Sequence, residues 1–229
     1  RYSDILKCIS LRRSVKWKFI KSFFKVNLDL FIRSLSFQVV YSGFTAIAAR
    51  YGDVQLAVSS VMMQLLLLYS YFVDGFAYAG EALAGRYIGE RDGASLRSVV
   101  RNVFMWAFVL SVISTAAYFF FPRTIIGLIT NDAQVIDACG PFLFWLLLMP
   151  VMSCIAFTWD GIYIGATASA PMRNCMVTAA VMFILTYLLC RGRFGIQSIY
   201  IAYFAHLLVR TIYLSVIFRN NPIFTNFAG

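Results

Sequence analysis

The chain has 229 residues, of which 61% are hydrophobic and 13% are charged, and its mean hydropathy is +0.76. Soluble domains average about 45–50% apolar and about 25% charged residues, so this composition excludes a soluble globular enzyme, a disordered chain and a small disulfide-stapled domain. The net charge of +10 comes from basic residues that lie between long apolar runs, which favours a membrane protein with basic cytoplasmic anchors over a nucleic-acid-binding protein.

Residues 1–25 contain eight Lys and Arg. We predict that they form a basic cytoplasmic segment or amphipathic linker that faces anionic lipid. The segment has no uninterrupted apolar stretch and no small-residue cleavage site, so it does not match a signal peptide. Because the chain begins with Arg1 rather than Met, we expect it to be a piece of a longer protein.

Six apolar runs follow, each long enough to cross a membrane as a helix. They predict helices at residues 26–49, 54–78, 100–121, 136–157, 172–190 and 196–218. A polar stretch at 81–101 is expected to join the second helix to the third, and Thr130-Asn131-Asp132 to cap the fourth. The runs are too long for the alternating strands of a membrane barrel. The sequence therefore predicts one all-α membrane domain over residues 26–219, followed by a tail at 220–229.

The distribution of Lys and Arg predicts the orientation of this domain. With the N-terminus in the cytoplasm, fourteen basic residues fall on the cytoplasmic side and four on the outer side. Because cytoplasmic loops carry the excess of basic residues, we expect both termini to be cytoplasmic. The bias and the missing signal peptide fit a bacterial inner membrane.

Six charged residues cluster near the predicted cytoplasmic ends of the helices. They are Asp29, Arg33, Asp74, Glu81, Asp160 and Arg173. Asp29 and Arg33 are four residues apart, and Asp74 and Glu81 are seven apart, so each pair shares a helix face. Charged side chains at bilayer depth usually form ion pairs or line a water-filled cavity. Two hypotheses stay open: ion pairs that only tie the helix ends together, or a cytoplasmic gate whose pairing changes during a transport cycle.

Polar and small residues inside the spans suggest a cavity and close helix contacts. Gln38, Tyr41 and Gln64 are candidates for lining a cavity, with hydrogen bonds between helices as the alternative. Many aromatic and methionine side chains would suit a cationic or amphipathic organic molecule. Glycines that allow close helix approach are predicted at Gly75, Gly80, Gly85, Gly89, Gly161 and Gly165.

Residue patterns for catalysis or metal binding are missing from the sequence. The five cysteines form no CxxC pair, and His206 is the one histidine, so we expect no metal site and no disulfide framework. His206 is expected to be structural or pore-facing. No GxSxG or HExxH motif is present, and no NPA or TVGYG-type filter indicates a channel. We predict that the protein is not an enzyme and carries no cofactor of its own.

Four stretches in order, spanning most of the chain, resemble the multidrug and toxic compound extrusion (MATE) family, in its DinF-like branch. Residues 27–33 (NLDLFIR) are similar to the start of that branch's seventh helix, and residues 74–85 (DGFAYAGEALAG), continuing to Gly89, to the end of the eighth. Residues 125–135 are similar to the segment before the tenth helix. Residues 160–167 (DGIYIGAT) and 172–174 (MRN) are similar to the loop that joins the tenth helix to the eleventh.

The resemblance implies twelve helices in two six-helix lobes, of which this chain matches the second. It implies export of organic cations and other amphipathic compounds in exchange for H⁺ or Na⁺, by alternating access. In this branch the coupling carboxylate belongs to the first helix of the first lobe, so no residue here inherits that role. We therefore expect a C-terminal half that is not active alone, with the N-terminal six-helix lobe, the lipid bilayer and small amphipathic molecules as its partners.

Three alternatives stay open. The chain could belong to a flippase for lipids or amphipathic substrates in the same superfamily. It could be a non-transporting six-helix membrane subunit. It could also pair with a second copy of itself as a homodimer of half-transporters.

Overall fold

The computed structural model describes residues 17–220 and 222–225, so most of the predicted basic segment lies outside the described residues. Six of the described helices are long and apolar enough to cross a membrane. They are α3 (Trp17–Ala48), α4 (Asp53–Glu90), α5 (Gly93–Phe120), α8 (Leu143–Gly165), α9 (Ser169–Phe194) and α10 (Gln197–Asn220). The predicted all-α fold with six spans is confirmed.

Short elements complete the described chain. They are the 3₁₀ turns η1 (Ala49–Tyr51) and η2 (Gly140–Phe142) and the helices α6 (Pro122–Gly127), α7 (Ala133–Ala138) and α11 (Pro222–Thr225). Asp132 caps α7, as predicted, because its Oδ1 accepts a hydrogen bond of 2.9 Å from the Gln134 backbone N–H.

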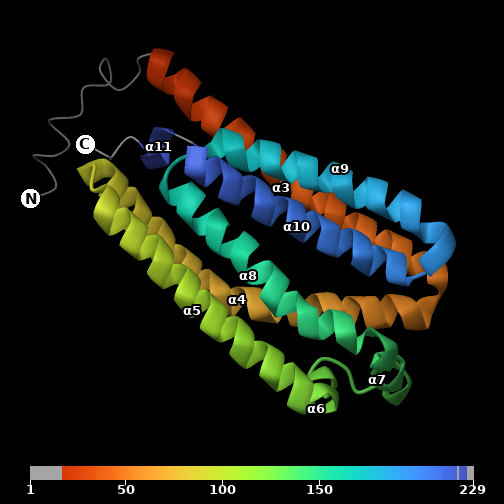
Figure 1. Ribbon diagram of the computed structural model, residues 1–229. Coiled ribbons are helices and arrows are strands. Elements are labelled where there is room, and N and C mark those ends of the chain that lie inside the picture. The colour runs from red at the N-terminus through yellow and green to blue at the C-terminus, as the bar shows by residue number, and fades with distance from the viewer. Residues whose placement is uncertain (1–16, 221, 226–229) are drawn as a thin grey trace, which may run out of the picture.

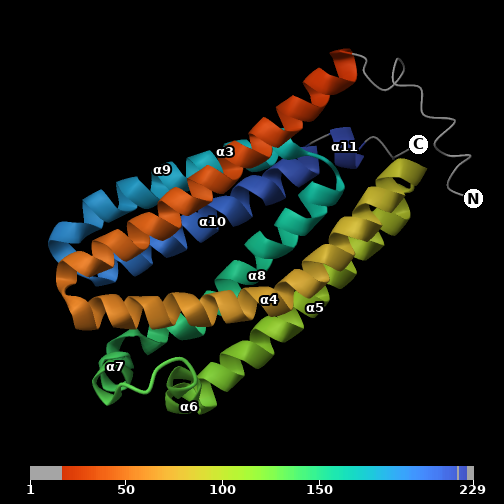
Figure 2. The same ribbon diagram turned by 180° about the vertical axis from the view of Figure 1, so that it is seen from behind.

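The long helices run up and down in two groups. In Figures 1 and 2, α3, α9 and α10 lie together, and α4, α5 and α8 form the other group. Helix α8 joins the groups, since it contacts α4, α5 and α10. The start of α3 and the end of α10 lie at the same end of the molecule as the α4–α5 and α8–α9 turns (Figure 1). Residues far apart in sequence therefore meet between the two groups.

Most of the predicted connection between the second and third helices is in fact helical. Helix α4 continues to Glu90 instead of ending at 78, and α5 begins at Gly93 instead of 100, so only a short turn is left of the expected linker. The residues there include good helix formers such as Ala, Glu and Arg, so the fall in hydrophobicity marks the end of the membrane-spanning part and not the end of the helix. At 38 residues, α4 is about 57 Å long against a hydrocarbon core of about 30 Å.

The fourth predicted helix is displaced along the sequence. The chain leaves the helix at Cys139, passes through η2, and re-enters it at Leu143. Pro141 explains the break, because the residue before a proline is disfavoured in a helix. Helix α8 then runs to Gly165, so Asp160 lies inside it and not in the loop that was predicted.

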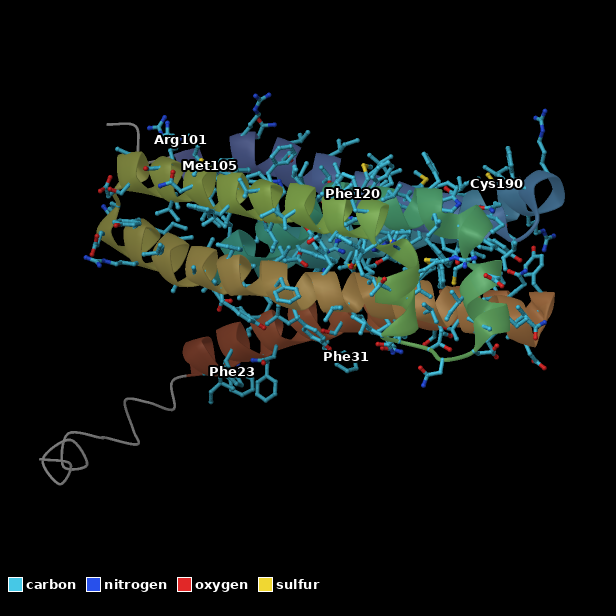
Figure 3. The ribbon with its side chains drawn as sticks, turned by 90° about the horizontal axis from the view of Figure 1, so that it is seen from below. Phe23, Phe31, Arg101, Met105, Phe120 and Cys190 are labelled. Atoms are coloured by element: carbon cyan, nitrogen blue, oxygen red, sulfur yellow. The ribbon has the colours of Figure 1, made fainter. Side chains whose placement is uncertain are left out.

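Large apolar side chains on the outside of the bundle suit a lipid environment. Phe23 and Phe31 are 66% and 64% exposed, and Figure 3 shows them pointing away from the other helices. Met105 and Phe120 are likewise exposed along α5. In water such a surface would aggregate, so this exposure supports the assignment of these helices to a membrane.

An aspartate closes the α4–α5 turn and gives the fold a local dependence on pH. The Oδ1 atom of Asp92 accepts hydrogen bonds from the backbone N–H groups of Ala94 (3.1 Å) and Ser95 (3.0 Å) at the start of α5. Bonding to Ser95, through its side chain and then its backbone, lowers the pKa of Asp92, with a smaller contribution from Ala94. A lowered folded-state pKa gives stability above the unfolded pKa, and this stability is lost as pH falls through the folded pKa.

We expect Asp92→Ala to speed amide hydrogen exchange at Ala94 and Ser95 at neutral pH, with the difference from wild type vanishing in acid. The reason is that the alanine offers no acceptor to the free N–H groups of the first turn. Asp92→Asn is the matched control, because asparagine keeps the cap but cannot titrate. Protection of the Ala94 and Ser95 amides, relative to their intrinsic exchange rates at each pH, should persist in acid in Asp92→Asn. An equal loss of protection in acid in the Asp92→Asn variant and the wild-type protein would contradict the cap.

Candidate functional site

A cavity of about 380 Å³ lies between α3, α4, α8, α9 and α10. We call it the charged cavity, because four of its lining residues carry charge: Arg33, Asp74, Asp160 and Arg210. Aromatic and aliphatic side chains, including Phe157 and Leu66, form much of the rest of its wall. A cavity of this size with a few convergent polar groups is the usual form of a small-molecule site.

Asp160 is the centre of the charges in this cavity. Its Oδ2 atom accepts hydrogen bonds from Nη2 of Arg33 (2.7 Å) and from Nη2 of Arg210 (2.6 Å). The side chains of Arg33, Asp160 and Arg210 are 21%, 18% and 1% exposed. Two guanidinium groups therefore share one carboxylate oxygen, and this joins α3, α8 and α10.

A second ion pair lies one helical turn earlier in α3. Arg173 donates from Nη1 to Oδ1 of the buried Asp29, and Ser169 Oγ donates to Oδ2 of Asp29 at 2.9 Å. This group ties α3 to the first turns of α9. Although Asp29 and Arg33 are spaced to pair with each other, each pairs with another helix.

The two remaining predicted charges have no ion pair within the described part of the chain. Asp74 and Glu81 line a second, smaller cavity of about 220 Å³, to which Arg33 and Asp160 also contribute. Asp74 lines the charged cavity as well. All six predicted charges therefore lie in this region, four in ion-paired groups and two as unpaired carboxylates.

Arg210 was not among the predicted site residues. It interrupts the sixth apolar run, and a charge inside a span is itself a signal for function. It is 1% exposed, and its Cζ lies 5.5 Å from the centre of the Phe157 ring.

Two of the three candidate cavity residues line the charged cavity. Gln38 and Tyr41 are among its lining residues, and Gln38 also donates to Ser42 Oγ at 2.9 Å. Gln64 does not line the charged cavity; it is exposed on α4, and its role as a cavity residue stays a prediction. The cavity-lining residues of α4 include Met63 and Asp74, and Gln64 is turned about 100° away from that stripe by the helical period.

Glycines bring α8 against α4. A Cβ atom on Gly161 would overlap the backbone carbonyl of Ala77, and one on Gly165 would overlap that of Glu81. On α4, a Cβ on Gly85 would lie 3.0 Å from the carbonyl oxygen of Gly165. These contacts place Asp160, next to Gly161, beside α4 and the charged cavity.

The other glycines predicted to allow close helix contacts differ in their surroundings. A Cβ on Gly80 would lie 3.4 Å from Val103, so this glycine faces a near neighbour. At Gly75 and Gly89 an added Cβ would have no described atom within 4 Å, so close packing at these two glycines stays a prediction.

His206 is fully buried and stacks on Tyr203, with ring centroids 5.9 Å apart. Tyr203 lines the charged cavity, whereas His206 is not among the residues that line it. Within the described residues, no group of three or more His, Cys, Asp or Glu is placed to hold a metal ion.

Comparison with known sequences gives matches over most of the chain. The MatE family profile matches residues 30–190. DNA damage-inducible protein F of Escherichia coli (strain K12) is 34% identical over 196 residues, which cover 86% of this chain and 42% of that protein. Protein DETOXIFICATION 43 of Arabidopsis thaliana is 26% identical over 190 residues, which cover 83% of this chain and 36% of that protein. The chain thus spans less than half the length of these relatives.

Comparison with solved structures gives the same fold. A crystal structure of MATE in complex with MaL6 superposes with a TM-score of 0.79 at 18% identity, covering 94% of this chain and 50% of that chain. A crystal structure of MATE in the bent conformation gives a TM-score of 0.77 at 16% identity, covering 98% of this chain and 50% of that chain. The described helices therefore have the architecture of half of these structures.

Proposed function

Because the chain belongs to the MatE family, we propose that it forms one lobe of a secondary-active efflux transporter. The family consists of transporters and not enzymes, as the sequence predicted. We propose that the complete transporter exports organic cations or other amphipathic molecules in exchange for H⁺ or Na⁺. The observation that carries this proposal is a charged cavity of small-molecule size inside a family-matched six-span bundle.

We propose further that this lobe is the C-terminal one and that its partner is an N-terminal six-helix lobe. The order of the four motifs, from residues 27–33 to residues 172–174, supports this assignment. We also propose that both termini face the cytoplasm of a bacterial cell. The basic residues near the α4–α5 turn, Arg86, Arg91 and Arg97, support that orientation.

The two ion-paired groups are proposed to act as the cytoplasmic gate. The Asp160 group joins α3 and α10 to α8, which belongs to the other helix group, and the Asp29 group joins α3 to α9. Alternating access needs contacts that hold one state and break in another. Asp74, which lines the same cavity without an ion pair, would be an alternative partner for Arg33 when the gate opens.

The gate is tested by the Arg33→Gln substitution in the full-length protein that contains these residues. Loss of one ion pair shifts a two-state equilibrium by about 1.4 kcal/mol, so we expect dye efflux to slow by about tenfold. The measurement is ethidium efflux from cells that lack their major exporters, at matched membrane expression. Asp74→Asn should give a similar loss.

Arg86→Gln is the matched control for this experiment. Arg86 pairs with Glu90 at 2.9 Å, but the two side chains are 63% and 49% exposed, and such surface pairs contribute little. Wild-type efflux in Arg33→Gln and Asp74→Asn would remove the gate and leave the pairs as helix ties. An export-negative wild-type protein would refute the proposed efflux itself.

A further inference from the structure

Asp74 is the one charged side chain of the charged cavity that makes no ion pair within the described residues. No hydrogen bond from the described part of the chain reaches its carboxylate either. The residue is only partly buried, so a molecule in the cavity can reach its oxygens. A carboxylate at membrane depth is costly without a partner, and a bound ligand can supply that partner.

The two arginines of the cavity are held by Asp160 instead. Arg33 and Arg210 both donate to its Oδ2 atom, at 2.7 and 2.6 Å. The Nε atom of Arg33 and the Nε and Nη1 atoms of Arg210 are buried, so they are closed to a solute in the cavity. Among the four charges, Asp74 is therefore the one that is both unpaired and open to a ligand.

The sum of these charges favours a ligand with a single positive charge. Arg33, Asp74, Asp160 and Arg210 add up to zero, so the cavity has no net charge that would attract or repel an ion from a distance. A monovalent cation beside Asp74 gains a local partner. A dication would also bring a second positive charge toward the two guanidinium groups.

The rest of the wall suits the body of such a cation. Phe37 and Tyr41 line the cavity, and aromatic rings attract cationic groups as well as apolar surface. Ser70 lines it one helical turn before Asp74, and its Oγ donates to the Leu67 carbonyl at 2.9 Å. The Ser70 hydroxyl can therefore still accept a hydrogen bond from a ligand N–H.

Arg33 is a competitor for the same carboxylate. Arg33 and Asp74 line both the charged cavity and the smaller cavity of about 220 Å³. Arg33 holds Asp160 through Nη2, and a guanidinium that left Asp160 would find a second carboxylate in Asp74. A cation that occupies Asp74 therefore keeps Arg33 on Asp160.

We infer that Asp74 holds the cationic group of the substrate, and that the substrate and Arg33 compete for this carboxylate. The inference rests on the proposed function, and it adds the residue that selects for charge and the way in which the gate senses the substrate. While the cation is bound, Arg33 stays on Asp160. When the cation leaves, Arg33 can exchange to Asp74. By linkage, the Arg33–Asp74 pair and the bound cation weaken each other to the same extent.

Three fluorescent probes that differ in their tail charge test the role of Asp74. They are dansylcadaverine, its N-acetyl derivative and dansyl-6-aminohexanoate, which are cationic, neutral and anionic at the tail. Binding is measured by dansyl fluorescence with the full-length protein in phosphatidylcholine nanodiscs, after subtraction of the signal from empty nanodiscs. A charge-assisted hydrogen bond predicts that the amine binds about tenfold more tightly than the amide, and the acid no better than the amide.

Asp74→Asn should abolish the preference, so that the amine and the amide bind alike. The change keeps the shape of the side chain and breaks no ion pair of the described residues, so the variant should fold. Glu90→Gln is the matched control, because it removes an exposed carboxylate from the last turn of the same helix, and its preference should equal that of wild type. Equal binding of amine and amide in wild type, or a preference that survives Asp74→Asn, overturns the inference.

Arg33→Gln tests the competition. If Arg33 holds Asp74 in half of the molecules, removing Arg33 tightens amine binding by about twofold. In the Asp74→Asn background the same change should have no effect on the amine, because the shared carboxylate is gone. A simple repulsion between Arg33 and the amine would persist in that background. Such persistence, or an unchanged affinity in Arg33→Gln alone, overturns the competition.

Transport of the same probes separates this inference from the proposed function. Export of dansylcadaverine without preferential binding of the amine would refute the cation site and leave efflux standing. Asp74-dependent binding of the amine without export of any probe would support the site and count against efflux. Binding in nanodiscs requires no ion gradient, so the two results are independent.

Discussion

Replacing Asp160 with Asn is expected to destabilise the protein more than any other charge removal in the bundle. Asp160 is the one ion-pair partner of Arg33 and of the buried Arg210 within the described residues. Removing one partner of a buried ion pair costs about 3–5 kcal/mol, because an uncompensated charge stays behind. For a chain of this size that lowers the thermal midpoint by on the order of 10 °C. Tryptophan fluorescence during heating in detergent measures it.

Asp137→Asn is the matched control for Asp160→Asn. Arg123 and Asp137 are 2.7 Å apart, the same distance as Arg33 and Asp160, but their side chains are 80% and 67% exposed. Exposed pairs contribute about 0–1 kcal/mol, so this variant should melt within a few degrees of wild type. Equal midpoints for the two variants would show that burial of Asp160 does not matter.

A double-mutant cycle then isolates the pair itself. Arg210→Gln added to Asp160→Asn removes the more deeply buried of the two unpaired guanidinium groups, so the double variant should melt above Asp160→Asn alone. Coupling between contacting residues is about 0.5–3 kcal/mol. Additive losses would mean that Arg210 and Asp160 stabilise the bundle through separate contacts.

The sequence predicted the spans well because the bilayer sets a strong requirement. Each membrane-crossing helix needs about 20 apolar residues, and six such runs correspond to the six long helices. Hydropathy does not mark helix ends, however, and α4 continues to Glu90 through residues that favour helix in water. The break before Leu143 depended on Pro141, a local backbone signal inside an apolar run.

The site was predictable by residue type but not by partner. Local spacing placed Asp29 and Arg33 on one helix face, yet their partners are Arg173 and Asp160, which lie 144 and 127 residues away. Such partners depend on the packing of whole helices, which a single sequence does not contain. Gln38 and Gln64 look alike in sequence, and only the phase of each helix decides which one lines the cavity.

Gly161→Ala is expected to produce the second large effect, because it acts on the contact that positions Asp160. Alanine favours a helix over glycine by about 1 kcal/mol, so propensity alone predicts a gain in stability. The added Cβ would overlap the Ala77 carbonyl, however, and backbone atoms cannot move aside by changing rotamer. Overpacking of this kind costs about 1–3 kcal/mol, so we expect a lower thermal midpoint than wild type.

Gly75→Ala isolates this steric effect from helix propensity. Gly75 lies in the interior of α4, and an added Cβ there would meet no described atom within 4 Å, so its midpoint should stay level or rise. The two variants should also differ in function. Because Gly161 is adjacent to Asp160, pushing α8 from α4 would move the carboxylate relative to Arg33 and Arg210. Efflux should therefore weaken in Gly161→Ala and persist in Gly75→Ala, and equal behaviour of the two variants would refute the close contact between α4 and α8.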